Sequence, residues 1–149
     1  MPEITKLEDA EKRSRLLTAL YIAQEQYGYL SPEAVEQTAK RLDLPTQEVY
    51  STASFYTMFR TEPVGRYVLQ VCTGLCCYLA GGAERLVDYL SEKLGIKAGE
   101  TTPDGLFTLK TVECLASCGT SPAMQVNDEL YEDLTMDKVD RLLDQLAGR

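Results

Sequence analysis

The sequence contains no histidine and no tryptophan among its 149 residues. Histidine is the side chain that most often serves as a general acid or base, and it activates serine and cysteine nucleophiles. Its absence therefore excludes Ser-His-Asp and Cys-His nucleophile arrangements, histidine-rich zinc enzymes and histidine acid–base catalysis. Any chemistry on this chain must use other side chains.

Basic charge and long apolar runs are also scarce. The chain has 15 lysines and arginines against 23 aspartates and glutamates, a net charge of -8. Nucleic acids and anionic membrane surfaces bind basic patches, so neither is an expected partner, whereas a protein that is basic at the contact would fit. No stretch approaches the roughly 18 apolar residues of a membrane span, and residues 1–6 do not resemble a signal peptide. We expect a cytoplasmic protein without direct membrane insertion, and structural disulfides are rare there.

The N-terminal part has helical hydrophobic spacing. A first helix is predicted from Leu7 to Tyr27, where Gly28 suits its end. Ser31 followed by Pro32 is a typical helix start. Further helices are thus expected from residue 31 and from residue 45. The helical rows that are predicted to face inward consist of Leu16, Leu20, Ala23, Tyr27, Ala34, Val35, Thr38, Ala39, Leu42, Val49, Ala53 and Tyr56. The aromatic group of Phe55, Tyr56 and Phe59 is expected to be core rather than a docking surface. Residues 1–62 are predicted to be a helical bundle.

From residue 63 onward, strand patterns enter the sequence. Strands are predicted at 66–71, 106–112, 123–126 and 130–132, and helices after Cys77 and from Thr135. A strand–helix–strand crossover followed by a hairpin and a last helix is the thioredoxin-like arrangement. The expected fold class is α+β, with a thioredoxin-like domain at residues 63–149. Such folds often place a cis proline at a point comparable to Pro122, although trans is the base-rate expectation for Ser121–Pro122.

The five cysteines fall into two groups, each directly after a predicted strand. Cys72, Cys76 and Cys77 follow the first strand, and Cys114 and Cys118 follow the second. In a crossover unit these strands are parallel neighbours or near neighbours, so their C-terminal loops open on the same edge of the sheet. Four thiolates from two such loops are the ligand set of an iron–sulfur cluster or of a zinc ion.

The spacing of the cysteines favours a two-iron cluster. Structural zinc sites often close on C-x2-C pairs, whereas the pairs here are C-x4-C and C-x3-C, with either Cys76 or Cys77 able to complete the first group. Gly74 and Gly119 would let backbone N–H groups approach sulfur, and Leu75, Leu115 and Ala116 would shield a cluster from water. The alternatives are a zinc site, buried free thiols and a redox dithiol, which the absence of C-x-x-C disfavours.

Three segments resemble one known family. Residues 71–83 (VCTGLCCYLAGGA), 112–128 (VECLASCGTSPAMQVND) and 49–56 (VYSTASFY) are similar to the thioredoxin-like [2Fe–2S] subunit of respiratory complex I, the NADH–quinone oxidoreductase. The resemblance runs from about residue 16 to residue 146. It implies that Cys72, Cys77, Cys114 and Cys118 hold one [2Fe–2S] cluster. It leaves Cys76 as a non-ligating thiol where the family more often has a small residue such as serine.

The resemblance also implies a partner and a role. In this family the subunit docks on a flavoprotein that binds NADH and FMN, and its cluster exchanges electrons with that flavin in the peripheral part of a membrane-associated complex. The same module recurs in soluble NAD-linked hydrogenases and formate dehydrogenases. The sequence has neither a Gly-rich dinucleotide fingerprint after a strand nor a P-loop, so this chain is not expected to bind nicotinamide or flavin itself. It is expected to be an oxidoreductase subunit without a complete active site of its own.

Overall fold

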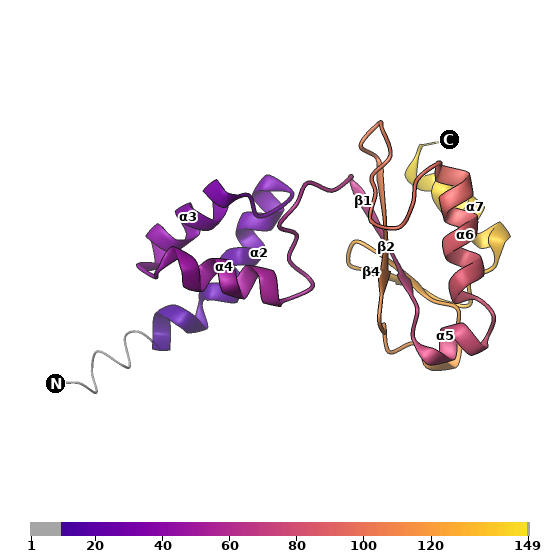
Figure 1. Cartoon of the computed structure of the whole chain (residues 1–149), viewed down its shortest axis with the longest axis horizontal. Helices are drawn as coiled ribbons and strands as arrows, with labels where there is room; N and C mark the ends of the chain where they lie inside the picture. The colour runs from indigo at the N-terminus through magenta and orange to yellow at the C-terminus, as the bar shows by residue number, and fades with distance from the viewer. Residues whose placement is uncertain (1–9, 149) are drawn as a thin grey trace. The chain divides into compact units, whose positions relative to one another are not determined.

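The computed structural model describes residues 10–148, and the chain divides into two compact units between Pro63 and Val64 (Figure 1). The first unit contains helices α2 (Leu16–Tyr27), α3 (Pro32–Leu42) and α4 (Thr46–Phe55). Apolar residues of these helices and of their connections pack into one core, which comprises Leu16, Leu20, Ala23, Leu30, Val35, Ala39, Leu44, Val49, Ala53 and Phe59. The helical unit thus has a hydrophobic core of its own.

Local signals in the sequence set the ends of these helices. Gly28 ends α2 with a φ of 78°, a conformation that glycine adopts without strain. The hydroxyl of Ser31 accepts a hydrogen bond of 3.2 Å from the Ala34 N–H and so caps α3. The predicted first helix is interrupted, because residues 10–14 are helical but Arg15 is a turn residue. Its predicted start at Leu7 lies outside the described residues.

Two expectations about burial in this unit are wrong. Tyr27 is 52% exposed, because it lies at the last turn of α2 and its hydroxyl donates to the Gln37 side chain at 3.3 Å. The aromatic group is divided: Phe59 is buried, whereas Phe55 is 78% exposed and Tyr56 37% exposed. Helix α4 ends at Phe55 and the chain turns away at Tyr56, so Phe55 stays outside the core.

The second unit is built on a four-stranded mixed sheet of order β2-β1-β3-β4. Strand β1 (Tyr67–Cys72) pairs in parallel with β2 (Phe107–Val112), and Cys72 lies opposite Val112. Strand β3 (Met124–Val126) is antiparallel to β1, and β4 (Glu129–Tyr131) completes the hairpin. The parallel pairing places the carboxyl ends of β1 and β2 at the same edge of the sheet.

Helices α6 (Ala83–Leu94) and α7 (Met136–Leu146) lie on one side of this sheet (Figure 1). The Asp140 carboxylate joins them, because it accepts hydrogen bonds from the Tyr89 hydroxyl and from Lys93 Nζ, the latter at 2.7 Å. The core between helices and sheet consists of Leu69, Val71, Leu86, Leu90, Ile96, Phe107, Leu109, Met124, Val126, Leu134, Val139, Leu142 and Leu143. Residues 10–148 include no helix that is long and apolar enough to cross a membrane.

The segment after Cys72 differs from the prediction. Instead of one helix after Cys77, a short helix α5 (Leu75–Leu79) is followed by a break and then by α6. The break is at Gly81, which has a φ of 67°, and at Gly82, where a Cβ atom would lie 2.1 Å from Cγ of Pro122. The Ser121–Pro122 peptide bond is cis, whereas the base rate leads us to expect trans. This expectation is weak because X–Pro bonds have only a small preference for trans.

Candidate iron–sulfur site

The five cysteines lie on the two loops that follow β1 and β2. Cys72 is the last residue of β1, and Cys76 and Cys77 belong to α5. Cys114 lies in the loop after β2, and Cys118 begins the short 3₁₀ helix η1 (Cys118–Thr120). Helix α5 lies at the end of the sheet where the connection from β2 to β3 also runs (Figure 1). The parallel pairing of β1 and β2 therefore brings both cysteine loops to one edge, as the sequence predicts.

The two loops are held against each other by their backbones. The N–H and the hydroxyl of Thr73 both donate to the Val112 carbonyl, at 2.9 and 3.0 Å. At Gly74 a Cβ atom would come within 2.8 Å of the Glu113 carbonyl oxygen and 3.5 Å of the Cys72 sulfur. Only glycine allows this approach, so Gly74 has the role predicted for it. A Cβ atom at Gly119 would meet nothing within 4 Å, so no neighbouring atom requires glycine there, and its N–H approach to sulfur stays a prediction.

Cys72 and Cys77 form a buried pair of thiols. Each is 3% exposed, and Ala83 and Leu115 pack against them. Burial raises the pKa of Cys72, although the Gly74 and Leu115 N–H groups oppose it. Burial also acts to raise the pKa of Cys77, but the Ser121 hydroxyl and the Ala123 N–H outweigh it, and this pKa is lowered. The pair thus lies in an apolar pocket whose backbone and side chain donors favour sulfur in its deprotonated form.

Cys76, Cys114 and Cys118 are exposed. The Ala116 N–H donates to the Cys114 sulfur at 3.3 Å. The Cys76 thiol, and secondarily the Cys114 thiol, raises the pKa of Cys118, which shows that these sulfurs lie close together. Within residues 10–148, no three Cys, His, Asp or Glu side chains surround a common point as a single metal ion requires. The thiols therefore form a buried pair and an exposed group on facing loops.

The predicted apolar shield is only partly present in the structure. Leu115 packs against the buried pair, but Leu75 is 71% exposed, and Ala116 is exposed with a φ of 58°. Two further side chains of α5, Tyr78 and Leu79, are exposed by 53% and 74%. The edge that carries the thiols thus presents a small apolar surface to the outside.

Ser121 is a site residue that the sequence reasoning missed. Its hydroxyl oxygen lies 3.4 Å from the Cys77 sulfur and donates to the Cys118 carbonyl at 3.2 Å. It thereby links the buried pair to the second cysteine loop. A serine next to proline carries no local signal of such a contact, because Ser121 and Cys77 are far apart in the sequence.

A polar network supports the second loop and was also missed. The hydroxyls of Ser117 and Thr120 both donate to the Glu132 carboxylate, Thr120 at 2.5 Å, and Ser117 is buried. The Ser117 hydroxyl, and then that of Thr120, hold the pKa of Glu132 below its ordinary value. The Asp133 N–H donates to the Thr120 carbonyl at 2.8 Å. The segment after β4 thus fixes the loop that carries Cys118.

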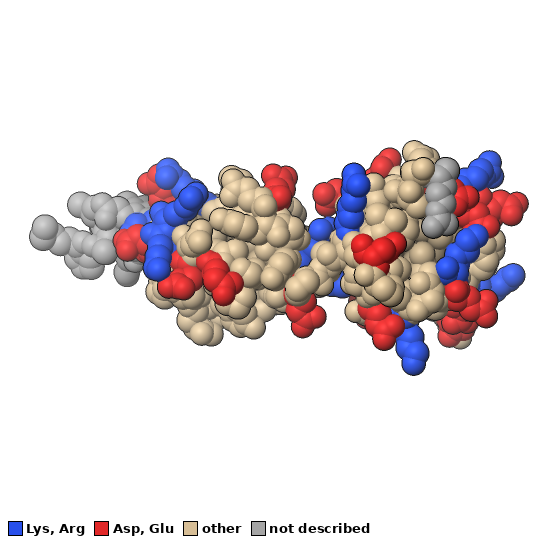
Figure 2. All heavy atoms as spheres, turned by 90° about the horizontal axis from the view of Figure 1, so that it is seen from above, with Lys and Arg blue, Asp and Glu red and all other residues tan. Residues whose placement is uncertain are grey.

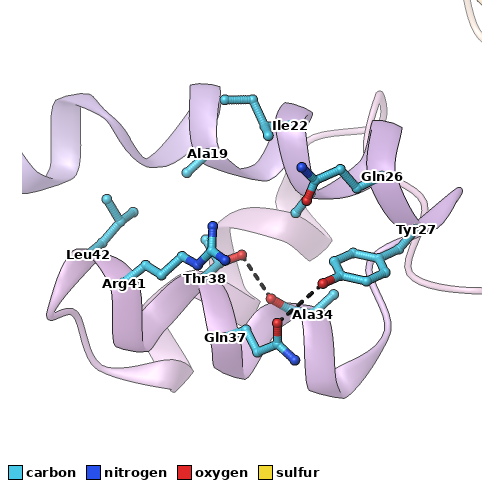
Figure 3. A pocket seen from close by; sticks show the side chains of 10 residues that line it. Ala19, Ile22, Gln26, Tyr27, Ala34, Gln37, Thr38, Arg41 and Leu42 are labelled. Carbon is cyan, nitrogen blue, oxygen red and sulfur yellow. Dashed lines mark hydrogen bonds between the residues drawn. The ribbon is translucent and has the colours of Figure 1, made fainter.

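The helical unit contains a groove between α2 and α3, with a volume of about 210 Å³ (Figure 3). Its lining includes the small side chains of Ala19 and Ala34, and the hydrogen bond from Tyr27 to Gln37 crosses one end. Arg41 is the charged residue of the lining, which has no cysteine and no carboxylate. The groove offers no group of convergent reactive side chains, so the candidate site is the cysteine edge.

The surface charges do not form a single patch on the face shown in Figure 2, where basic side chains lie among acidic ones. Several basic residues are engaged in ion pairs, such as Lys12 with Asp43 at 2.6 Å and Lys40 with Glu36 at 2.9 Å. Exposed pairs of this kind contribute little to stability, but they neutralise charge locally.

Comparison with known proteins agrees with the fold and with the family that the sequence resembles. The sequence model of the thioredoxin-like [2Fe-2S] ferredoxin family matches residues 2–147. An NADH-quinone oxidoreductase subunit of Rhizobium meliloti is 46% identical over 138 residues, which cover 93% of this chain and 82% of that protein. NADH-quinone oxidoreductase subunit 2 of Thermus thermophilus is 47% identical over 140 residues, which cover 93% and 77% of the two chains.

A similar fold occurs in the crystal structure of an NAD+-reducing [NiFe]-hydrogenase in the air-oxidized state. The TM-score is 0.76 at 24% identity, and the match covers 87% of this chain but 23% of the hydrogenase chain. At this identity the likeness concerns the fold alone, and it confirms the predicted α+β, thioredoxin-like class. With the sequence match over nearly its whole length, the chain belongs to the thioredoxin-like [2Fe-2S] ferredoxin family.

Proposed function

We propose that this chain is an electron-transfer subunit of an NADH–quinone oxidoreductase and that Cys72, Cys77, Cys114 and Cys118 hold its [2Fe–2S] cluster. The observation that carries the proposal is the position of these thiols on two facing loops at the carboxyl edge of the parallel strands β1 and β2. The relatives at 46% and 47% identity are named as subunits of that enzyme.

The donor set fits a two-iron cluster. Four cysteine thiolates are the usual ligands of [2Fe–2S], and two irons can be reached from two separate pairs of sulfurs. The described thiols are grouped in this way, with Cys72 beside Cys77 and Cys114 in the same loop as Cys118. A single zinc ion would need all its ligands around one point, whereas two irons suit thiols that come in two separate pairs.

Cys77 is preferred to Cys76 as the fourth ligand because of its surroundings. Cys77 is buried beside Cys72, whereas Cys76 is exposed on α5. The resemblance of residues 71–83 to the family implies the same choice. Cys76 lies near Cys118, so it remains a nearby thiol that takes no iron when Cys77 is present.

When bound, the cluster supplies one-electron transfer. This chain's own residues would keep water from the sulfurs of Cys72 and Cys77, whereas those of Cys114 and Cys118 are exposed. Cys72 and Cys77 are buried, and the N–H groups of Gly74 and Leu115 point toward sulfur. Cys114 and Cys118 are exposed, and so are the apolar side chains Leu75, Tyr78 and Leu79 of α5. A cluster in this position would lie close to a docked redox partner.

The partner in this proposal is a flavoprotein that binds NADH and FMN in the peripheral part of the complex. Hydride chemistry would take place on that subunit, because electron exchange with a flavin needs only the cluster from this chain. A second candidate is the equivalent diaphorase subunit of a soluble NAD-linked hydrogenase or formate dehydrogenase. The occurrence of the same fold in an NAD+-reducing hydrogenase is the reason to keep this candidate, although the likeness concerns the fold alone.

The test is to isolate the native assembly through a tag on this chain. The proposal predicts that FMN and an NADH-oxidising flavoprotein co-purify with it, and that the preparation reduces ferricyanide with NADH. Quinone-reductase subunits among the co-purified proteins would support complex I, and hydrogenase or formate dehydrogenase subunits would support the second candidate. A chain that carries its cluster but recovers no flavin would contradict the proposed partner.

A further inference from the structure

The hydroxyl of Ser121 lies between the two cysteine loops. Its oxygen is 3.4 Å from the Cys77 sulfur, and it donates its proton to the Cys118 carbonyl at 3.2 Å. Cys77 is 3% exposed, so water does not readily replace this contact. In the structure the Cys77 thiol donates and the Ser121 oxygen accepts.

Binding of iron reverses the direction of the hydrogen bond that this contact requires. A cysteine that ligates a metal is a thiolate and has no proton to donate. A serine hydroxyl has one proton and rotates freely about its Cβ–Oγ bond, so it is able to donate to either neighbour. A hydrogen bond to an anionic acceptor is roughly twice as strong as one to a neutral carbonyl. The thiolate of Cys77 is therefore the better acceptor for the Ser121 proton.

We infer that in the cluster-bearing protein Ser121 donates a hydrogen bond to the Cys77 sulfur and raises the reduction potential of the cluster. The inference rests on the proposed role of Cys77 as a ligand. Reduction by one electron increases the negative charge on the ligand sulfurs, so a donor stabilises the reduced cluster more than the oxidised one. Ser121 keeps its proton throughout and acts on the cluster through Cys77 as a positioning residue.

The chain offers a matched control for this contact. Thr73 is another hydroxyl residue on the same edge, and it donates to the Val112 carbonyl at 3.0 Å. Thr73→Val removes a hydroxyl from the first loop without removing the contact to Cys77, and the Thr73 N–H still holds the Val112 carbonyl at 2.9 Å. Ser121→Ala removes the contact, and Ser121→Thr keeps a hydroxyl at the same position.

The experiment is a redox titration of the full-length, cluster-loaded protein, followed by electron paramagnetic resonance, for wild type and these three variants. Ser121→Ala is expected to shift the midpoint potential to more negative values. A tenfold decrease in the equilibrium constant for reduction of the cluster would correspond to a shift of ~59 mV in the midpoint potential for one electron. Ser121→Thr and Thr73→Val are expected to stay close to wild type, and the Fe–S stretching frequencies in resonance Raman spectra should change in Ser121→Ala alone.

Equal potentials for Ser121→Ala and wild type would overturn the inference, as would an equal shift in Thr73→Val. Ser121→Gly provides a second truncation if Ser121→Ala does not retain iron. If neither truncation retains iron while Ser121→Thr does, the hydroxyl serves assembly and the tuning role is refuted. A wild-type protein without iron would instead contradict the proposed function, which separates the two failures.

Discussion

Gly74→Ala tests directly whether the contact between the two cysteine loops shapes the site. A Cβ atom at this position would lie 2.8 Å from the Glu113 carbonyl oxygen, 3.5 Å from the Cys72 sulfur and 3.7 Å from the Cys114 Cβ. Ordinary van der Waals contact begins at 3.4 Å, so the carbonyl must move away by ~0.6 Å. The nearest atom belongs to the backbone, so no side-chain rotation can relieve the clash.

The same displacement would act on the neighbouring hydrogen bond. Thr73 donates its N–H to the Val112 carbonyl at 2.9 Å, and a separation of ~0.6 Å would take this pair outside good hydrogen-bond geometry. Overpacking costs about 1–3 kcal/mol in general, and a lost hydrogen bond about 1 kcal/mol. We therefore expect Gly74→Ala to lower the free energy of unfolding by about 2–4 kcal/mol.

Gly119→Ala is the matched control, because a Cβ atom there would meet nothing within 4 Å and Gly119 has no positive φ. Urea unfolding of the reduced apoprotein, followed by circular dichroism, measures stability, and iron per chain after reconstitution measures the site. Gly74→Ala should lose both stability and iron, and Gly119→Ala should lose neither. Equal values for the two variants would refute the account of how the loops meet.

Three further predictions concern the site. Cys114→Ser should abolish or severely reduce iron binding, whereas Cys76→Ser should leave iron and sulfide contents unchanged; loss of iron from Cys76→Ser would show that the ligand assignment is wrong. Glu132→Gln should speed hydrogen exchange of residues 114–121 in the apoprotein at neutral pH, because Ser117 and Thr120 lose an anionic acceptor. Since the pKa of Glu132 is lowered in the folded state, its stabilising effect is present above the unfolded pKa and is lost as the pH falls below about 4. The difference between wild type and Glu132→Gln should therefore vanish in acid, and a difference that persists at pH 3 would contradict this reasoning.

The parts of the fold that depend on neighbouring residues could be predicted from the sequence. Gly28 and Ser31 end and begin helices because of their own backbone and side chain chemistry. Cys72 comes at the end of β1 because the preceding residues are strand formers, and the crossover rule then places both cysteine groups at one edge. These inferences need no knowledge of distant contacts.

The parts that were missed depend on residues that meet only in the folded chain. Position 82 requires glycine because Pro122, forty residues later, occupies the space that a side chain there would fill. The side chain of Ser121 contacts Cys77, and Glu132 accepts hydrogen bonds from Ser117 and Thr120. No local sequence pattern indicates either of these contacts. Tyr27 follows the helical row but lies at its end, where its side chain stays half exposed.

The most direct test of the central claim is the electron paramagnetic resonance spectrum of the dithionite-reduced protein, purified without air, with iron, sulfide and zinc measured on the same sample. The account predicts a spin-half signal with about two irons and two sulfides per chain and no stoichiometric zinc. One zinc per chain, with no iron and no signal, would contradict it and would leave a zinc-stabilised binding module in its place.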